Sequence, residues 1–197
     1  MTNSTTLPLY WDLASVDPQV RENAANSLIT SLANFQNAHK MTVKDKWDDL
    51  LEWDDSEKRL DALSAPDVSY ALRRLIRGLP SSRQGARQGF SLALTELLAT
   101  MDFVTVKLVA DLLFKFTART PGMKGEEERE MLFGRIFGFM CIVDSGILKR
   151  STTAEDDIRR IVDSLVEMAG AKSYLTECCY HVMMSMLPHV SAPFDGA

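Results

Sequence analysis

The sequence predicts an all-α protein in which antiparallel pairs of helices stack side by side as an α-solenoid. Every long segment shows the 3.6-residue apolar period of a helix, and none shows the sustained alternation of a strand. Residues 67–101 read as two helices folded back on each other across a short Gly-Leu-Pro-Ser-Ser corner. A motif near residue 20 recurs near residue 86: an apolar residue, an arginine, and apolar positions three and seven places after that arginine. Stacked helix pairs bury together what one pair cannot bury alone.

The first helix is predicted to begin at Asp17-Pro18, because Asp is a favourable N-cap and Pro is favoured at the first helical position. Its apolar stripe consists of Val20, Ala24, Leu28, Leu32 and Phe35. The next segment is strongly charged and is predicted to hold one short helix around residues 46–63. We therefore expect a single helical-repeat domain over residues 1–197, with residues 38–66 as a charged insertion.

The central pair is predicted to span residues 67–78 and 82–100. The first helix carries Leu72, Leu75, Ile76 and Leu79 at helical spacing, and the second carries Ala86, Phe90, Leu94, Leu97 and Leu98. Pro80 cannot continue a helix interior, and Gly78 is expected to take the left-handed cap conformation, so the break is placed between them.

Four further helices are predicted at residues 103–119, 126–144, 155–168 and 174–187, with a loop at 120–125 and with Pro188 ending the last helix. Gly134 and Gly138 form a Gly-x-x-x-Gly pair, which in this context indicates close helix packing. The most apolar run, residues 131–148, is interrupted by Arg135 and Asp144 and is short for a bilayer span, so a buried helix is predicted and no membrane partner.

The charge of the chain is distributed unevenly. The net charge is −5, which gives no general reason to expect nucleic-acid binding. Residues 67–124 nevertheless carry 9 basic and 4 acidic side chains, a balance of +5, whereas the flanking parts each have a balance of −5. The three cysteines, two of them adjacent, suit a reducing compartment better than a disulfide framework.

No catalytic, cofactor or metal site is predicted. The acidic cluster at residues 47–55 would spread its carboxylates around a helix axis, whereas a two-metal polymerase needs carboxylates that converge on two cations. Cys178, Cys179 and His181 lie close in sequence, but no second pair of ligands completes a structural zinc site. No small-molecule substrate is expected.

The candidate binding residues are five arginines, which we call the arginine stripe: Arg73, Arg74, Arg77, Arg83 and Arg87. No acidic residue lies between Asp67 and Glu96. One interpretation is contact with phosphate or with an acidic partner, without sequence-specific recognition. The other is that the stripe is a solvated face, and that Arg87, like Arg21, lies at the edge of the core and pairs with a neighbouring acid.

Two resemblances extend this interpretation. Residues 17–28, DPQVRENAANSL, resemble the second helix of HEAT repeats. Residues 10–32, 67–98 and 125–148 together resemble the N-terminal part of the Myb-binding protein and DNA polymerase phi family, whose fungal members are called DNA polymerase V. This resemblance implies a HEAT-like or armadillo-like scaffold of the nucleus and nucleolus. Because family members are several times longer, it also implies that the chain is an N-terminal fragment of a longer solenoid.

The function expected from the resemblance is a non-enzymatic scaffold that supports rRNA transcription, rRNA processing and ribosome biogenesis. Its expected partners are nucleolar and ribosome assembly proteins, with rRNA or rDNA bound through the arginine stripe. Two alternatives stay open: a DNA-directed DNA polymerase, as the family name suggests, and a general HEAT adaptor, for instance in nuclear transport.

Overall fold

A computed structural model describes residues 6–51 and 55–190, and within these ranges the chain is helical with no strand. The α-helices are α1 (Leu7–Asp12), α2 (Pro18–Thr42), α3 (Trp47–Leu51), α4 (Ser56–Leu63), α5 (Pro66–Gly78), α6 (Gln84–Thr100), α7 (Val106–Phe116), α8 (Gly125–Asp144), α9 (Glu155–Ala171) and α10 (Thr176–Val190). Short 3-10 turns lie at Lys44–Lys46, Ile147–Lys149 and Ser173–Leu175. The predicted all-α class is confirmed for the described residues.

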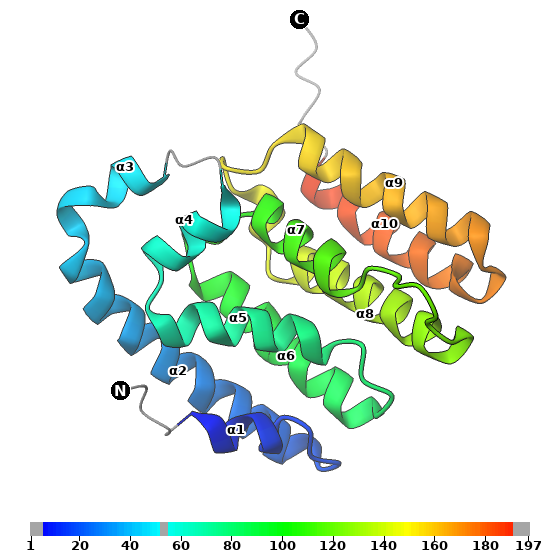
Figure 1. Cartoon of the computed structure of the whole chain (residues 1–197), viewed down its shortest axis with the longest axis horizontal. Helices are drawn as coiled ribbons and strands as arrows, with labels where there is room; N and C mark the ends of the chain where they lie inside the picture. The colour runs from blue at the N-terminus through cyan, green and yellow to red at the C-terminus, as the bar shows by residue number, and fades with distance from the viewer. Residues whose placement is uncertain (1–5, 52–54, 191–197) are drawn as a thin grey trace, which may run out of the picture.

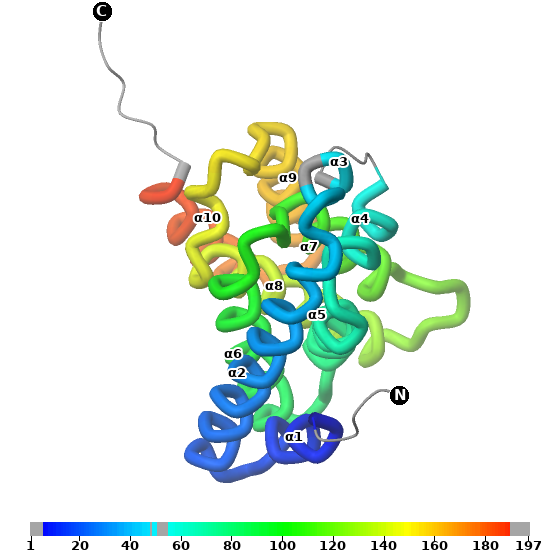
Figure 2. Tube along the Cα trace, turned by 90° about the vertical axis from the view of Figure 1, so that its left-hand side faces the viewer, coloured from blue at the N-terminus to red at the C-terminus, as the bar shows by residue number. Residues whose placement is uncertain are grey.

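The helices form two layers (Figures 1 and 2). Helices α2, α6, α8 and α10 pack side by side in a back layer. Helices α5, α7 and α9 lie in front of them in Figure 1, with α4 against α5 and α7. Each front helix returns antiparallel into the back layer, as the pairs α5–α6, α7–α8 and α9–α10 show. Contacts within each pair join consecutive helices, whereas contacts along the back layer, such as those of α2 with α6, join segments that are far apart in sequence.

The core follows the apolar periods of the sequence. On α5 and just after it, Leu72, Leu75, Ile76 and Leu79 are fully buried. On α6, Leu94, Leu97 and Leu98 are fully buried, and Ala86 is nearly so. Complete burial of one such leucine or isoleucine stabilises the fold by about 1.5–3 kcal/mol, so these two stripes contribute strongly to the packing of the central pair.

Of two predicted helix boundaries, the cap at Asp17 is confirmed and the left-handed cap at Gly78 is not. Asp17 caps α2 as expected, since its carboxylate accepts a hydrogen bond from the Gln19 amide at 2.9 Å. The left-handed cap at Gly78 is wrong, because the positive φ angles within the described residues belong to Gly122 and Gly146. Gly78 is instead required by packing, since a Cβ there would overlap the Phe90 ring, with Cγ only 2.6 Å away.

The single helix expected at residues 46–63 is replaced by α3 and α4. Asp55 begins α4 as its N-cap, and its carboxylate accepts hydrogen bonds from the Glu57 and Lys58 amides, both at 3.1 Å. Residues 52–54, in the middle of the predicted acidic cluster, lie outside the described residues. Helix α1 was not predicted, and Pro188 lies inside α10 instead of ending it.

Small residues allow the helix pairs to approach closely. A Cβ on Gly89 of α6 would overlap the Leu13 carbonyl group, with its carbon at 2.8 Å. A Cβ on Gly134 of α8 would meet the Pro80 ring at 2.6 Å, and one on Gly138 would meet the Leu113 side chain at 2.7 Å. The close packing predicted for the Gly134 and Gly138 pair is thus confirmed, and Gly89 allows a similar approach in the preceding helix pair.

Arg150 joins the end of the α8 segment to the end of α6. Its Nη1 donates to the Met101 and Val104 carbonyls at 2.9 Å each, and its Nη2 donates to the Leu98 carbonyl at 2.6 Å and the Ala99 carbonyl at 3.3 Å. Burial lowers the pKa of this guanidinium from its ordinary value. The Leu98 and Ala99 carbonyls, in the last turn of α6, and the Met101 and Val104 carbonyls just beyond it are all bound by this one cation.

Candidate partner-binding surfaces

The arginine stripe does not form one surface. Arg73, Arg74 and Arg77 lie on α5 in the front layer, and Arg83 stands at the start of α6. Arg87 lies one turn into α6, in the back layer, where it borders a different hollow. The five residues therefore divide into a group of three on α5, Arg83 at the N-cap of α6, and Arg87 beside a separate hollow.

Arg73 is largely committed to ion pairs. Its two terminal nitrogens donate to the two Asp61 carboxylate oxygens at 2.8 and 3.0 Å, and Glu57 lies 3.7 Å away. This two-point geometry fixes the orientation of the guanidinium. The positive charge of Arg73 is therefore largely neutralised, and this residue adds little free positive charge to the α5 surface.

Arg74 and Arg77 are held by aromatic rings. The Arg74 guanidinium lies over the Tyr10 ring at 4.4 Å and donates a hydrogen bond to the Tyr70 hydroxyl. The Arg77 guanidinium is exposed and lies over the Phe116 ring at 4.2 Å. Stacking of this kind fixes the position of a cation and leaves its outer N–H groups available, and Arg keeps its charge in such contacts.

These arginines line a shallow pocket of about 380 Å³ together with Ser69 and Tyr70. No carboxylate belongs to the lining. Burial raises the pKa of the neighbouring Tyr10 phenol well above its ordinary value, so Tyr10 stays neutral beside Arg74. We call this lining the α5 arginine pocket; it offers N–H and O–H donors and excess positive charge to a ligand.

Arg83 and Arg87 have different surroundings. Arg83 is exposed at the N-cap position of α6, where its side chain makes no capping hydrogen bond. Arg87 donates from Nη1 to the Ser81 carbonyl at 2.7 Å, six residues upstream, and lies 5.9 Å from the Phe137 ring. Arg21 makes the equivalent contact with the Ser15 carbonyl at 2.9 Å. The predicted pairing of Arg87 and Arg21 with an acid is wrong, because both bind carbonyls of the preceding loop.

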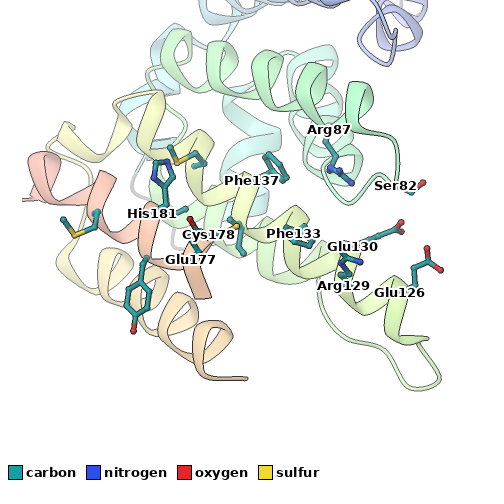
Figure 3. Close-up of a pocket in the computed structure, with 15 residues that line it drawn as sticks. Ser82, Arg87, Glu126, Arg129, Glu130, Phe133, Phe137, Glu177, Cys178 and His181 are labelled. Carbon is teal, nitrogen blue, oxygen red and sulfur yellow. The ribbon is translucent and has the colours of Figure 1, made fainter. Parts of the chain in front are cut away.

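The structure also contains a larger groove that sequence reasoning missed (Figure 3). It has a volume of about 1000 Å³ and lies between α8, α10 and the start of α6. Its floor is apolar, and its rim carries charged or polar side chains. The floor consists of Phe133, Ile136, Phe137, Met140, Val182 and Met184, and the rim includes Arg87, Glu126, Arg129, Glu130, Glu177, Tyr180 and His181. We call it the α8–α10 groove.

The groove was missed because its two sides are far apart in sequence. Phe133, Phe137 and Met140 repeat at three and four residues, which sequence reasoning alone assigns to the core. In the structure they are only half-buried, and Met184 of α10 is 65% exposed. Figure 3 shows Phe133 and Phe137 lying between Arg87 of α6 and Cys178 of α10.

The cysteines do not form a site. Cys179 points into the core, and burial raises the pKa of its thiol to about 11, whereas Cys178 is half-buried on the groove. Within residues 6–51 and 55–190, no group of three or more His, Cys, Asp or Glu side chains is placed to hold a metal ion. None of the helices in this part of the chain has the length and apolar character needed to cross a membrane.

A third hollow, of about 520 Å³, lies near the start of α9 and is lined in part by Trp47, Lys107 and Asp157. Asp157 is buried, and this burial raises the pKa of its carboxyl group from the ordinary value. Ionisation of the Asp157 carboxyl group therefore lowers the stability of the folded protein.

Comparison with known proteins decides the family. The sequence profile of the family described as DNA polymerase phi matches residues 70–193, more than half of the chain. The chain belongs to the DNA polymerase phi family. The resemblance seen in the sequence is thereby confirmed, and the match covers most of the α5 arginine pocket and the whole α8–α10 groove.

Similarity to individual proteins supports the assignment to the DNA polymerase phi family. It is 32% identical over 190 residues to the rDNA transcriptional regulator pol5 of Schizosaccharomyces pombe, which covers 96% of this chain and 17% of that protein. It is 26% identical over 211 residues to the rDNA transcriptional regulator POL5 of Saccharomyces cerevisiae, covering 95% and 18%. Human Myb-binding protein 1A is 29% identical over 141 residues, covering 69% and 10%. The chain thus spans less than a fifth of these relatives, and no solved structure matches it.

Proposed function

We propose that this chain is a non-catalytic helical-repeat scaffold that supports rDNA transcription and ribosome biogenesis in the nucleolus. The names of its relatives, rDNA transcriptional regulator in two yeasts and Myb-binding protein 1A in human, favour a nuclear role in transcription. Two packed layers of antiparallel helices favour a protein that presents surfaces to partners.

The scaffold is proposed to be of the HEAT type. The support is a repeated contact: Arg21 of α2 and Arg87 of α6 each donate to the carbonyl six residues upstream, at 2.9 and 2.7 Å. Both arginines occupy the same place in the sequence motif that recurs near residues 20 and 86. The same hydrogen bond between a helix arginine and the preceding loop thus recurs in α2 and α6, which are neighbours in the back layer, as expected of stacked repeats.

The α5 arginine pocket is proposed to contact the phosphates of rRNA or rDNA, with exposed Arg83 extending the basic surface. The observation that carries this proposal is the lining, which brings Arg74 and Arg77, neither of them in an ion pair among the described residues, together with the Tyr70 hydroxyl; the charge of Arg73 is already offset by Asp61. Because the contacts would be to the backbone, binding is expected to be salt-dependent and nearly independent of base sequence.

Fluorescence anisotropy with a labelled single-stranded RNA tests this proposal. Replacing Arg77 and Arg83 by Gln should weaken binding, and each phosphate that is no longer bound should lower the log–log salt slope by about 0.7. Arg159→Gln on α9, an exposed arginine paired with Glu155, is the matched control and should leave the slope unchanged. If the Arg77 and Arg83 variant binds RNA as the unaltered chain does, the proposed nucleic-acid contact is wrong.

The catalytic alternative has a separate test. The family name contains the word polymerase, and a polymerase site would need converging carboxylates. A primer-extension assay with Mg²⁺ and all four nucleotides should give no incorporation if the scaffold proposal is right. Incorporation that depends on this chain would overturn the non-catalytic proposal. Capture of rRNA and ribosome assembly factors from nuclear extract, in preference to transport factors, separates the scaffold from a general HEAT adaptor.

A further inference from the structure

We propose that the α8–α10 groove binds one amphipathic helix of a protein partner, with an apolar stripe on the floor and Lys or Arg beside that stripe. This inference rests on the proposed scaffold function but uses a different face from the α5 arginine pocket. It names the chemistry of a partner that the groove would recognise.

The size of the groove fits a helix. An α-helix with its side chains is about 10–12 Å across and rises about 5.4 Å per turn, so two turns occupy about 1,000 Å³. The groove has a volume of about 1000 Å³ and is framed on both sides by helices, α8 and α10. Two turns of a partner helix would fill it.

The apolar side chains on the floor of the groove favour contact with an apolar stripe of a partner helix. Phe133, Phe137 and Met140 recur on one face of α8 and are only half-buried. Across the groove, Tyr180 and Met184 of α10 are 58% and 65% exposed. Aromatic and methionine side chains are the ones enriched at the centre of protein interfaces, and methionine adapts its shape to the groups that it meets.

The charges of the rim specify what should lie beside that stripe. Within the described part of the chain, Glu126, Glu130 and Glu177 form no ion pair, although all three line the groove. The two cations of the rim, Arg87 and Arg129, keep their positive charge and are held in place by neighbouring groups. Arg129 lies 5.6 Å from the Phe133 ring and from the Tyr174 ring, and Arg87 donates to the loop carbonyl of Ser81.

Three carboxylates against two arginines leave the rim with a net charge of −1, and none of these carboxylates has an ion-pair partner among the described residues. Lys or Arg on the partner would complement these carboxylates and set the register of the docked helix. The same carboxylates would repel phosphate, so a nucleic acid is a poor occupant of this face.

The test uses the whole chain and synthetic helices of about 18 residues, long enough to form measurable helix in water. The probe peptide is Ala-rich, with Leu at i, i+3, i+4 and i+7 and Lys flanking this stripe. One matched peptide carries Glu in place of each Lys, and another carries Ser in place of each Leu. Fluorescence anisotropy should show binding of the Leu and Lys peptide, with at least tenfold weaker binding of both others.

Charge reversal in the protein provides the sharper comparison. Glu126→Lys with Glu177→Lys should invert the preference, so that the Glu-flanked peptide binds at least tenfold better than the Lys-flanked one. Met184→Glu should weaken binding of the Lys-flanked probe at least fivefold. Asp163→Lys, an exposed position on α9 outside the groove lining, is the control and should change neither result.

Equal affinity for all three peptides would overturn the inference, as would an affinity that Met184→Glu leaves unchanged. Self-association of the chain that Met184→Glu abolishes would also overturn it, because the groove would then hold a second copy of the chain. The Glu→Lys changes add positive charge that favours RNA binding by itself, so RNA binding is compared for Met184→Glu, which should stay close to the unaltered chain. If the chain does not bind RNA through the α5 arginine pocket but keeps its peptide preference, only the nucleic-acid proposal is contradicted.

Discussion

Gly89→Ala tests whether the close approach of α6 to the α1–α2 connection stabilises the fold. The added methyl group would overlap the Leu13 carbonyl group, with its carbon only 2.8 Å away. That carbonyl belongs to the backbone and shares its peptide plane with the Ala14 amide, which donates to the Trp11 carbonyl at 3.0 Å. The carbonyl therefore cannot rotate away as a side chain could, and α6 must move outward.

The size of the effect follows from opposing contributions. Ala in place of Gly in a helix interior is intrinsically stabilising by about 1 kcal/mol. Overpacking costs about 1–3 kcal/mol, and the outward shift would also lengthen the Arg21 to Gln88 hydrogen bond of 2.9 Å, where bonds to charged groups contribute about 1.5–3 kcal/mol. We expect a net loss of about 2–3 kcal/mol in the free energy of unfolding, which lowers Tm by about 4–12 °C for a chain of this size.

The assay is thermal and urea denaturation followed by circular dichroism, with Gly170→Ala as the matched control. A Cβ on Gly170 of α9 would meet nothing within 4 Å, so this variant should be more stable by up to about 1 kcal/mol. The two glycine variants should therefore shift Tm in opposite directions. If Gly89→Ala is as stable as the unaltered chain or more so, the steric reasoning is refuted.

Three further outcomes are expected. Arg150→Lys should lower the free energy of unfolding in urea by about 2 kcal/mol, because an ammonium group cannot replace the guanidinium at four carbonyls; equal stability would contradict this. Asp157 has a pKa raised above its ordinary value of 3.8, so it lowers stability progressively as pH rises from 3.8 to the raised pKa and by a constant amount above that. Asp157→Asn should therefore gain stability relative to the unaltered chain as pH rises above 3.8, and a pH-independent difference would contradict this. Cys141 and Cys179 are buried with thiol pKa values raised to about 11, so a maleimide at pH 7 should label Cys178 first, as peptide mass spectrometry would show.

Local signals predicted most of the fold. The stripes of residues 67–100 and the cap at Asp17 depend on neighbours within one or two turns, and such signals are visible in the sequence. The unpredicted helix α1 has only six residues, too few to show a period. It is held by tertiary packing of Tyr10, which is 2% exposed.

The surfaces were less predictable, because each depends on pairs that are distant in sequence. The arginine-rich run was visible, but the partners of its members were not: Asp61 for Arg73, Tyr10 for Arg74 and Phe116 for Arg77. Two of these three partners lie on helices other than those adjoining α5 in the chain. Periodicity assigns a residue to one face of a helix, but it does not say which other helix covers that face.

The arginines that donate to backbone carbonyls also affect how such a chain can diverge. Arg21, Arg87 and Arg150 bind carbonyl oxygens, which every residue possesses. For Arg21 and Arg87, the side chains of the bound loops can therefore change during evolution while the hydrogen bond is kept, whereas the arginine itself cannot become Lys without losing donors. In distant relatives, an arginine near the start of a helix should thus persist after the surrounding loop has become unrecognisable, and its spacing would be the last trace of the repeat.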